Sequence, residues 1–546
     1  MNNRYTSALH PGRVHLGSLL FFILTVAIWT TCASCQPKAL EDMEASDTAS
    51  FPYLEWEIAD FHANYDNGSL TIEEVVSAYL DRIAQIDQNG PELRSVLEVN
   101  PEALEIAREL DQMLQEGRKK GALHGIPVLL KDNIDTYDAM HTTAGSRALE
   151  GSKPLQDSFV AKKLREAGAV IIGKANLSEW ANFRGQLSSS GWSGLGGQTK
   201  NPYIIDRNPC GSSAGSGVAV SANLAVLAIG TETNGSIVCP STANGIVGIK
   251  PTVGLISRSG IIPISFTQDT PGPMTRTVRD AAISLGTMVG LDPADAKTST
   301  SDGRYLTDYT PFLKAEGLKG KKIGWMKSTA GINYKVDQLM EEAIAFMKAQ
   351  GAEIIPLQEV SPPGTGSYSF EVMLYEYKDG LNKYFSSLGP DAKIKSLEEL
   401  IEFNKQDPIE LAHYNQHYLE LALEKGDLSS PQYLEALEKL RVNSQDNGID
   451  KALKEHGLDA IIAPTGSPAW KTDWTNGDYY HLGSSSPAAH AGYPSISVPM
   501  GMIDELPVGI SFFSTAWSEP VLIELAYAFE QGTKARRAPK FLRQSY

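Results

Sequence analysis

The strongest candidate for chemistry in this sequence is a short segment rich in serine and glycine, NPCGSSAGSGVAV, at residues 208–220. It contains Ser212, Ser213 and Ser216 and turns apolar immediately afterwards. A serine hydroxyl is a useful nucleophile only when a neighbouring base takes its proton. The segment could therefore be a flexible linker, a loop that cradles phosphate, or part of a serine hydrolase.

Nucleotide-binding patterns do not match this segment. A phosphate loop needs G-x-x-x-x-G-K-[ST], and a dinucleotide loop needs G-x-G-x-x-G between a strand and a helix. Residues 211–215, GSSAG, do match the nucleophile elbow G-x-S-x-G, with Ser213 as nucleophile. An elbow follows directly on a strand, whereas Pro209 interrupts the approach here, so the elbow is disfavoured. A histidine after the loop, such as His490, keeps the elbow as an alternative.

Further motifs accompany this loop along the chain. They are GIPVLLKDNID at 125–135, AIGTETNGSIVCPS at 228–241, SFTQDTPGPM at 265–274 and AGYPSISVPMG at 491–501. On these motifs the sequence resembles the amidase signature family from about Leu54 to the C-terminus, and within that family it most resembles bacterial peptide amidases.

The resemblance implies a Ser-cisSer-Lys triad that cleaves carboxamides without a metal or other cofactor. Position by position, Lys131 would be the base, Ser212 the bridging cis-serine and Ser236 the nucleophile, with Ser213 in support. Lysine serves as a base only when neutral, which requires a pKa lowered towards about 7 to 8. Lys131 suits this role because it ends the apolar run 126–130, which would carry its side chain into the interior.

The family also stabilises the oxyanion with backbone N–H groups, here implied to be those of Thr233, Asn234, Gly235 and Ser236. Asn234 stands where a glycine is common, and asparagine tolerates positive φ better than most residues. Many relatives carry an arginine shortly after the nucleophile, whereas this chain has Val238 and Cys239 there. Without that cation, a neutral substrate is favoured over a carboxylate.

The implied activity is hydrolysis of a carboxamide, most of all the C-terminal amide of a peptide, through an acyl-enzyme that releases ammonia. Two alternatives stay open at this point. One is an amidase of the same family that acts on fatty or aryl amides. The other is a noncatalytic envelope lipoprotein that binds peptides, which the presence of all three triad residues disfavours.

The elements that must position these residues alternate between strands and helices. Buried strands are predicted near 126–131 and 169–176, a helix lies between them near 158–167, and strands return near 458–465, 493–501 and 506–513. Thr71 and Glu74 predict a capping box that opens another helix. The fold class is therefore α/β, and the resemblance implies the amidase signature fold, a central mixed β-sheet covered by helices on both faces. One domain is expected over 54–546, with a helical elaboration at about 300–448.

Composition limits the class of partner. The 546 residues include 48 Lys+Arg and 65 Asp+Glu, giving a net charge of −17. A chain this acidic repels a phosphate backbone, so nucleic acid is not expected as a ligand.

The N-terminus predicts export. Residues 1–35 have basic residues, an apolar run at 19–29 and small residues up to Cys35, which is typical of a signal peptide ending in a lipoprotein cleavage box. Lipidation of Cys35 would tether the protein to the membrane of a bacterial envelope or periplasm, with 36–53 as a flexible tether. Plain secretion and an uncleaved anchor are the alternatives.

The remaining cysteines, Cys210 and Cys239, are interpreted as small buried thiols in preference to a disulfide, because the sequence does not show the approach that pairing needs. His124 and His141 flank Lys131, but their spacing matches no metal-ligand motif. Asp269 is expected to order a loop on the substrate side or to have a structural hydrogen-bonding role.

Overall fold

The structure is a computed structural model that describes residues 51–543, and residues 1–50 and 544–546 lie outside the described part. The predicted signal peptide, Cys35 and the tether up to residue 50 therefore fall outside the described residues. Phe51, the first described residue, already contacts the core, since its ring lies edge-on to Tyr79 at 5.1 Å. None of the helices within residues 51–543 combines the length and the hydropathy of a membrane-spanning segment.

The described chain is built around a mixed sheet of 11 strands in the order β1-β3-β2-β6-β8-β7-β12-β13-β11-β9-β10. β2 runs parallel to its two neighbours β3 and β6, whereas β8 runs antiparallel to β6 and β7. The predicted α/β class with a central mixed sheet is confirmed. The strands are β1 (Val96–Val99), β2 (Pro127–Lys131), β3 (Val170–Ala175), β6 (Leu227–Glu232), β7 (Val247–Lys250), β8 (Thr270–Thr275), β9 (Lys322–Met326), β10 (Glu353–Leu357), β11 (Ala460–Pro464), β12 (Ser495–Ile503) and β13 (Leu506–Phe513), with β4 (Trp192–Ser193) and β5 (Gly197–Gln198) as a separate pair.

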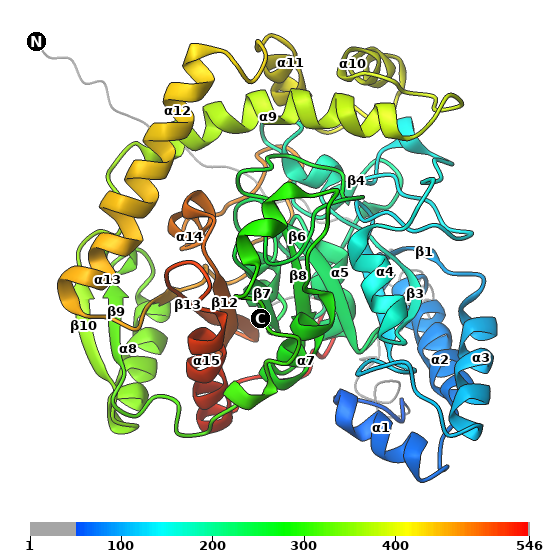
Figure 1. Cartoon of the computed structure of the whole chain (residues 1–546), viewed down its shortest axis with the longest axis horizontal. Coiled ribbons are helices and arrows are strands. Elements are labelled where there is room, and N and C mark those ends of the chain that lie inside the picture. Colours follow the sequence, from blue (N-terminus) through cyan, green and yellow to red (C-terminus); the bar gives the residue numbers. More distant parts are fainter. Residues whose placement is uncertain (1–50, 544–546) are drawn as a thin grey trace, which may run out of the picture. The chain divides into compact units, whose positions relative to one another are not determined.

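Helices flank this sheet, as predicted (Figure 1). One group, α5 and α6, packs against β6 and β7, and another, α7 and α15, packs against β8 and β12. The predicted capping box opens α2, where Thr71 Oγ1 accepts from the Glu74 N–H at 3.1 Å. The helices are α1 (Ile58–Asp66), α2 (Ile72–Arg82), α3 (Ala103–Gln115), α4 (Phe159–Glu166), α5 (Ala214–Ser221), α6 (Val238–Ala243), α7 (Val278–Met288), α8 (Tyr334–Ala349), α9 (Thr365–Ser387), α10 (Leu397–Gln406), α11 (His417–Leu423), α12 (Pro431–Arg441), α13 (Asp450–His456), α14 (Ser486–Ala491) and α15 (Glu519–Thr533).

The predicted helical elaboration at 300–448 is only partly helical. It contains α8 to α12, of which α9 to α12 gather at one side of the sheet in Figure 1. It also contains β9 and β10, which pair in parallel and extend the main sheet. The sequence interpretation missed them because each strand is a short apolar run beside lysine- and glutamate-rich helices.

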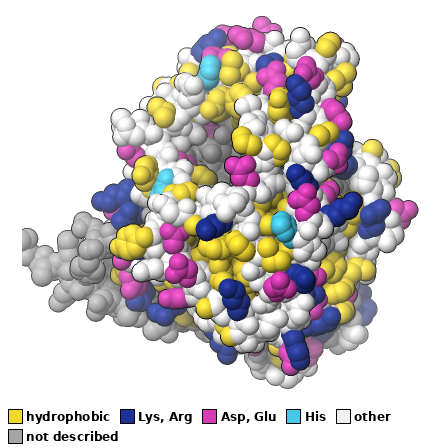
Figure 2. Space-filling model, turned by 90° about the vertical axis from the view of Figure 1, so that its left-hand side faces the viewer, with side chains coloured by type: hydrophobic (Ala, Val, Ile, Leu, Met, Phe, Trp, Pro, Cys, Tyr) yellow, Lys and Arg dark blue, Asp and Glu magenta, His cyan; other side chains and the backbone are white. Residues whose placement is uncertain are grey.

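Charged side chains of both signs are interspersed on the face drawn in Figure 2, with hydrophobic side chains between them. That face also has a hollow in its upper half.

The close pairing of β7 and β8 leaves no room for a side chain at Gly272. A Cβ there would lie 2.0 Å from the Ile249 carbonyl oxygen. We expect Gly272→Ala to lower the free energy of unfolding by about 1–3 kcal/mol, because the paired backbones must separate. Differential scanning calorimetry should show this as a melting temperature reduced by about 1–3 °C.

Gly366, in the first turn of α9, is the matched control. A Cβ there would meet only the His490 Cε1 atom at 3.9 Å, an ordinary contact. Gly366→Ala should leave the melting temperature unchanged or raise it, since alanine favours helix over glycine. Equal losses in the two variants would contradict the proposed clash at Gly272.

Candidate active site

Lys131 and Thr231 lie side by side because they come near the ends of two neighbouring parallel strands. β2 ends at Lys131 and β6 ends at Glu232. The two strands are in register, with Leu130 of β2 paired to Ile229 of β6. Open α/β sheets place their functional groups at the carboxyl ends of such strands. Every residue of β2 is buried, so Lys131 lies in the interior of the protein at the carboxyl end of its strand.

The Lys131 amine is fully buried and contacts three oxygen atoms. Its Nζ lies 2.7 Å from Ser212 Oγ, 2.8 Å from Thr231 Oγ1 and 3.1 Å from the Thr231 carbonyl oxygen. Burial lowers the pKa of Lys131 to about 7, although the carboxylates of Asp269 and Glu232 act in the opposite direction. A substantial fraction of the amine is therefore neutral at neutral pH.

These contacts match the hydrogen-bonding capacity of a neutral amine, which has two hydrogens and one lone pair. The Thr231 carbonyl can only accept, so it takes one hydrogen, and Thr231 Oγ1 takes the other. Lys131 Nζ and Ser212 Oγ are 2.7 Å apart, a contact in which the protonated amine donates to the hydroxyl oxygen. Once the amine is neutral, its lone pair faces the Ser212 hydroxyl. Lys131 is placed to take a proton from Ser212.

Ser212 follows a cis peptide bond with Gly211, as the family resemblance implied. Its carbonyl accepts from the Ser178 N–H at 3.0 Å, and the residue is 1% exposed. The loop thus presents the Ser212 hydroxyl to Lys131 while the Ser212 carbonyl is held from the other side.

Ser213 is used differently from Ser212. Its hydroxyl donates to the Thr231 carbonyl at 3.1 Å and accepts from the Thr231 N–H at 3.2 Å. The Ser213 hydroxyl therefore donates its one hydrogen to the backbone of β6 and accepts a hydrogen bond from the same backbone. The strand that precedes the loop, β5, already ends at Gln198, so the strand that a nucleophile elbow requires is missing as well. The alternative with Ser213 as an elbow nucleophile does not fit this geometry.

Ser236 lies in the turn between β6 and α6, and the Glu232 carboxylate organises this turn. Oε1 accepts from the Gly235 N–H at 2.8 Å, while Oε2 accepts from the N–H groups of Ile237 and Val238 at 2.8 and 3.0 Å. These bonds fix the backbone on both sides of Ser236. Within residues 51–543, no protein group hydrogen-bonds the Ser236 hydroxyl.

One of the four predicted oxyanion donors is wrong. The Gly235 N–H is committed to Glu232, because it holds the turn together. The N–H groups of Thr233, Asn234 and Ser236 are not used by any other described residue, so these three remain. The positive φ in the turn belongs to Gly235, at 88°, and not to Asn234. Tolerance of positive φ therefore does not explain the asparagine.

Asn234 instead ties the turn to α14. Its Oδ1 accepts from Ser485 Oγ at 2.7 Å, and its Nδ2 donates to Ser486 Oγ at 3.2 Å. The same Nδ2 lies 3.4 Å from His490 Nε2. Burial lowers the pKa of His490 to about 4, so this imidazole is neutral at neutral pH.

Asp269 orders the loop beside the turn. Its Oδ1 accepts from Thr233 Oγ1 at 2.5 Å, and its Oδ2 accepts from the N–H groups of Ile264 and Ser265 at 2.8 and 2.9 Å. Burial raises the pKa of Asp269 to about 6. These bonds give Asp269 the loop-ordering role considered from sequence.

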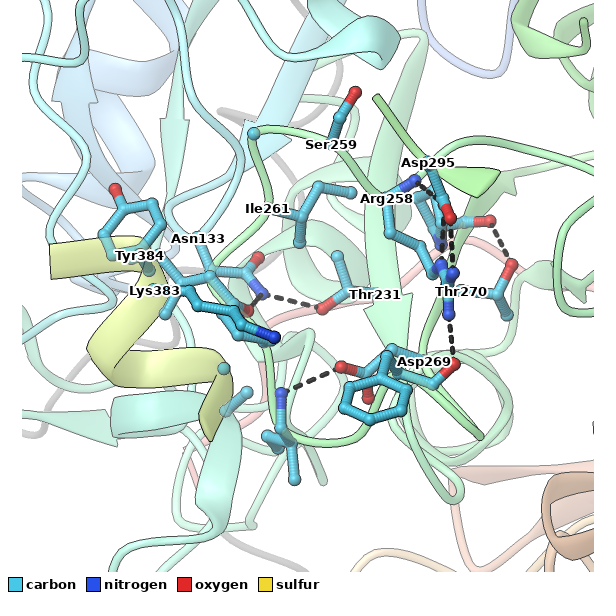
Figure 3. A pocket seen from close by; sticks show the side chains of 18 of the residues that line it. Asn133, Thr231, Arg258, Ser259, Ile261, Asp269, Thr270, Asp295, Lys383 and Tyr384 are labelled. Carbon is cyan, nitrogen blue, oxygen red and sulfur yellow. Dashed lines mark hydrogen bonds and ion pairs between the residues drawn. The ribbon is translucent and has the colours of Figure 1, made fainter. Parts of the chain in front are cut away.

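A cavity of about 420 Å³ opens beside Thr231 and Thr233. Figure 3 shows Asn133 pointing to Thr231, where its Nδ2 donates to Thr231 Oγ1 at 3.0 Å, with Lys383 and Tyr384 of α9 beside it. The rest of the wall is mixed. Its apolar side chains include Ile261, Ile262, Ile264 and Phe266, and its charged side chains include Arg258, Asp269, Asp295 and Asp379.

Sequence reasoning missed Thr231, Glu232 and Asn133. All three stand inside motifs that were singled out, GTETNGS and KDN. A signal existed for Glu232, because an acidic residue that ends a buried strand directly before a turn needs backbone donors. Nothing comparable marks Thr231, whose contacts depend on the pairing of β2 with β6.

Cys210 and Cys239 form a disulfide with a Cα–Cα distance of 5.9 Å, so the preference for two free thiols is wrong. The loop before Ser212 folds onto the first turn of α6, an approach that the sequence does not reveal. His141 Nδ1 lies 2.8 Å from Glu98 Oε1, and His124 Nε2 lies 3.2 Å from the Leu110 carbonyl, which are structural contacts. Residues 51–543 contain no cluster of His, Cys, Asp and Glu that could hold a metal ion.

Comparison with known proteins identifies relatives along most of the chain. The family model described as Amidase matches residues 74–523. A protein of Arabidopsis thaliana named a probable amidase is 41% identical, covering 91% of this chain and 93% of its own length. The crystal structure of native peptide amidase from Stenotrophomonas maltophilia is 49% identical with a TM-score of 0.87, covering 90% of this chain and 99% of that one. An amidase family protein from Bacillus anthracis is 37% identical with a TM-score of 0.82, covering 89% and 93%.

The environment of Lys131 predicts how the reactivity of Ser236 depends on pH. Below its pKa of about 7 the amine is protonated and cannot accept a proton, and above it the amine is neutral. We expect the rate at which a fluorophosphonate, a general reagent for activated serines, modifies Ser236 to rise between about pH 6 and pH 8. Mass spectrometry of the modified peptide over a pH series measures this rate.

Three variants sharpen the measurement. Lys131→Ala should lower the rate by about 10²-fold or more and remove its dependence on pH around 7. Ser212→Ala should lower it strongly, whereas the matched Ser213→Ala should keep more of the rate and the same midpoint. A label on Ser213, or a rate that is flat across this pH range in the unmodified protein, would contradict the assignment.

Proposed function

The chain belongs to the amidase signature family and is an amide-hydrolysing enzyme, and from this premise we propose that it hydrolyses the C-terminal carboxamides of peptides and releases ammonia. The observation that carries the peptide assignment is the 49% identity to a peptide amidase over 99% of that protein. The polar groups around Ser236 support the chemistry.

The proposed reaction begins with proton transfer. Lys131 takes the proton of Ser212, to which it is hydrogen-bonded at 2.7 Å, and Ser212 takes the proton of Ser236. Ser236 Oγ then attacks the carbonyl carbon of the amide. The negative charge that forms on the carbonyl oxygen is stabilised by the N–H groups of the turn, of which Thr233, Asn234 and Ser236 are available.

The second half of the cycle returns the proton. Lys131 passes it through Ser212 to the amide nitrogen, so the C–N bond breaks and ammonia leaves. The acyl group remains as an ester on Ser236. A water molecule then gives a proton to the same relay and attacks the ester, which releases a peptide with a free carboxylate and restores the Ser236 hydroxyl.

The residues after the nucleophile favour an uncharged substrate terminus. Val238 and Cys239 stand where many relatives carry arginine, and the Val238 N–H is spent on Glu232. Cys239 is held in a disulfide. These positions offer no cation to pair with a substrate carboxylate, whereas a neutral carboxamide needs none.

We also propose that the enzyme acts outside the cytoplasm, anchored through a lipid on Cys35. The support is the sequence pattern of residues 1–35, which ends in Ala33, Ser34 and Cys35. Mass spectrometry of the mature protein should find a diacylglyceryl-modified Cys35 at its N-terminus. An N-terminus elsewhere, or an unmodified Cys35, would contradict this proposal.

Ammonia release tests the substrate class. The panel pairs peptide amides with the same peptides carrying free C-terminal carboxylates, and adds fatty amides and aryl amides. We expect release from the peptide amides with kcat/KM at least about tenfold above the other amides, and none from the free peptides. Ser236→Ala should reduce the peptide amidase rate by at least about 10⁴-fold.

The other outcomes are equally informative. Efficient release only from fatty or aryl amides would move the substrate assignment to those compounds and leave the triad in place. A Ser236→Ala variant that keeps its activity would overturn the assignment of the nucleophile.

A further inference from the structure

The Cys210–Cys239 disulfide joins the two backbone segments that carry the two catalytic serines. Cys210 lies two residues before Ser212, and Cys239 lies three residues after Ser236. The two cysteines are separated by 29 residues in sequence, and this stretch contains α5 and β6. A covalent bond therefore closes a loop around the site itself.

On the loop side, the bond lies between an anchor and Ser212. Asn208 Nδ2 donates to the Ser190 carbonyl at 3.0 Å and lies 3.2 Å from Asp478 Oδ1. The Cys210 N–H donates to Asn208 Oδ1 at 2.8 Å. These hydrogen bonds hold the backbone from Asn208 to Cys210 in place. The disulfide then links this held segment covalently to Cys239 of α6.

On the nucleophile side, Cys239 belongs to the first turn of α6, and its N–H donates to the Gly235 carbonyl at 2.8 Å. Gly235 is held in turn by Glu232. Ser236 therefore lies on a backbone segment clamped at both ends, by Glu232 and by the disulfide-bonded Cys239.

Hydrogen bonds also join the two segments. The Ser213 N–H donates to the Ser236 carbonyl at 3.1 Å, and Asn244 Nδ2 donates to the Pro209 carbonyl at 2.9 Å. Proton transfer between hydroxyl groups needs a separation of about 2.6–3.2 Å, and the Ser236 hydroxyl has no hydrogen-bonded protein partner within residues 51–543. The relay therefore operates only when the two segments bring the Ser212 and Ser236 hydroxyls within that range.

We propose that the Cys210–Cys239 disulfide is a positioning element of the reaction, which sets the distance between Ser212 and Ser236 and makes the turnover rate depend on the redox state of these cysteines. This inference rests on the proposed roles of the two serines. It goes beyond fold stability, because it predicts an effect on the rate of the chemical step in protein that is still folded.

The surroundings of the bond favour its persistence. Both cysteines are 5% exposed and pack with apolar residues that include Tyr203, Ile204 and Trp470. A thiolate must reach a sulfur atom to open a disulfide, so this packing slows attack. Reduction by a dithiol transfers two electrons and two protons to the cysteines and leaves the reductant as its own cyclic disulfide.

The test compares the full chain with Cys210→Ala/Cys239→Ala under oxidising conditions and after treatment with dithiothreitol. We expect kcat for the best amide of the panel, and the fluorophosphonate rate at Ser236, to fall by about tenfold to a hundredfold in the double variant. KM and the pH midpoint set by Lys131 should stay unchanged. Near-UV circular dichroism and a melting temperature above the assay temperature establish that the compared proteins are folded.

Reduction and reoxidation give a second measurement on the unaltered sequence. Dithiothreitol should lower the rates of the wild type to those of the double variant, and oxidised glutathione should restore them by taking up the two electrons. The double variant leaves every cysteine outside the Cys210–Cys239 pair unaltered, so reagent effects elsewhere in the protein appear in both proteins. If the double variant does not fold, the test compares kcat and the fluorophosphonate rate of the folded, reduced wild type with those of the oxidised wild type.

Wild-type kcat and labelling rate in a folded protein that lacks the bond would overturn the proposal. A fall in melting temperature with unchanged rates would overturn it equally, because the bond would then only stabilise the fold. The labelling readout needs no amide substrate, so failure of the peptide amide assignment leaves this test intact.

Discussion

Burial of one amine is the constraint on which the site depends. Lys131 ends a strand whose residues are all buried, and loss of hydration is what lowers its pKa to about 7. The cost of that burial is limited because three oxygen atoms surround Nζ, two of them from Thr231. A strand pairing of β2 with β6 thus supplies both the low dielectric and the partners that make a lysine usable as a base.

A second constraint is how the turn after β6 divides its backbone donors. Glu232 takes three N–H groups, from Gly235, Ile237 and Val238, and so fixes the path of the chain. The N–H groups left over are the ones that can face a developing negative charge. Some N–H groups of the turn thus hold its conformation by bonding to Glu232, which preorganises the remaining N–H groups as donors.

The sequence was sufficient for the residues that carry their own signature. Lys131, Ser212 and Ser236 stand in motifs whose order and spacing are recognisable, and the α/β alternation follows from the strand and helix patterns. The contacts of Thr231, the disulfide of Cys210 and the loss of Gly235 as an oxyanion donor depend on which segments meet in space. The sequence did not predict β9 and β10, because a short apolar run next to a charged helix is easily assigned to that helix.

The tie between Asn234 and α14 also bears on how the enzyme can change over time. Lys131, Ser212 and Ser236 all come from the first half of the chain, whereas α9 and α14, which border the cavity and the turn, come from the second. Substitutions in the later segment can therefore alter what reaches the nucleophile without altering the nucleophile itself. Such a division lets one hydrolytic apparatus diversify among amides by local exchange of its borders.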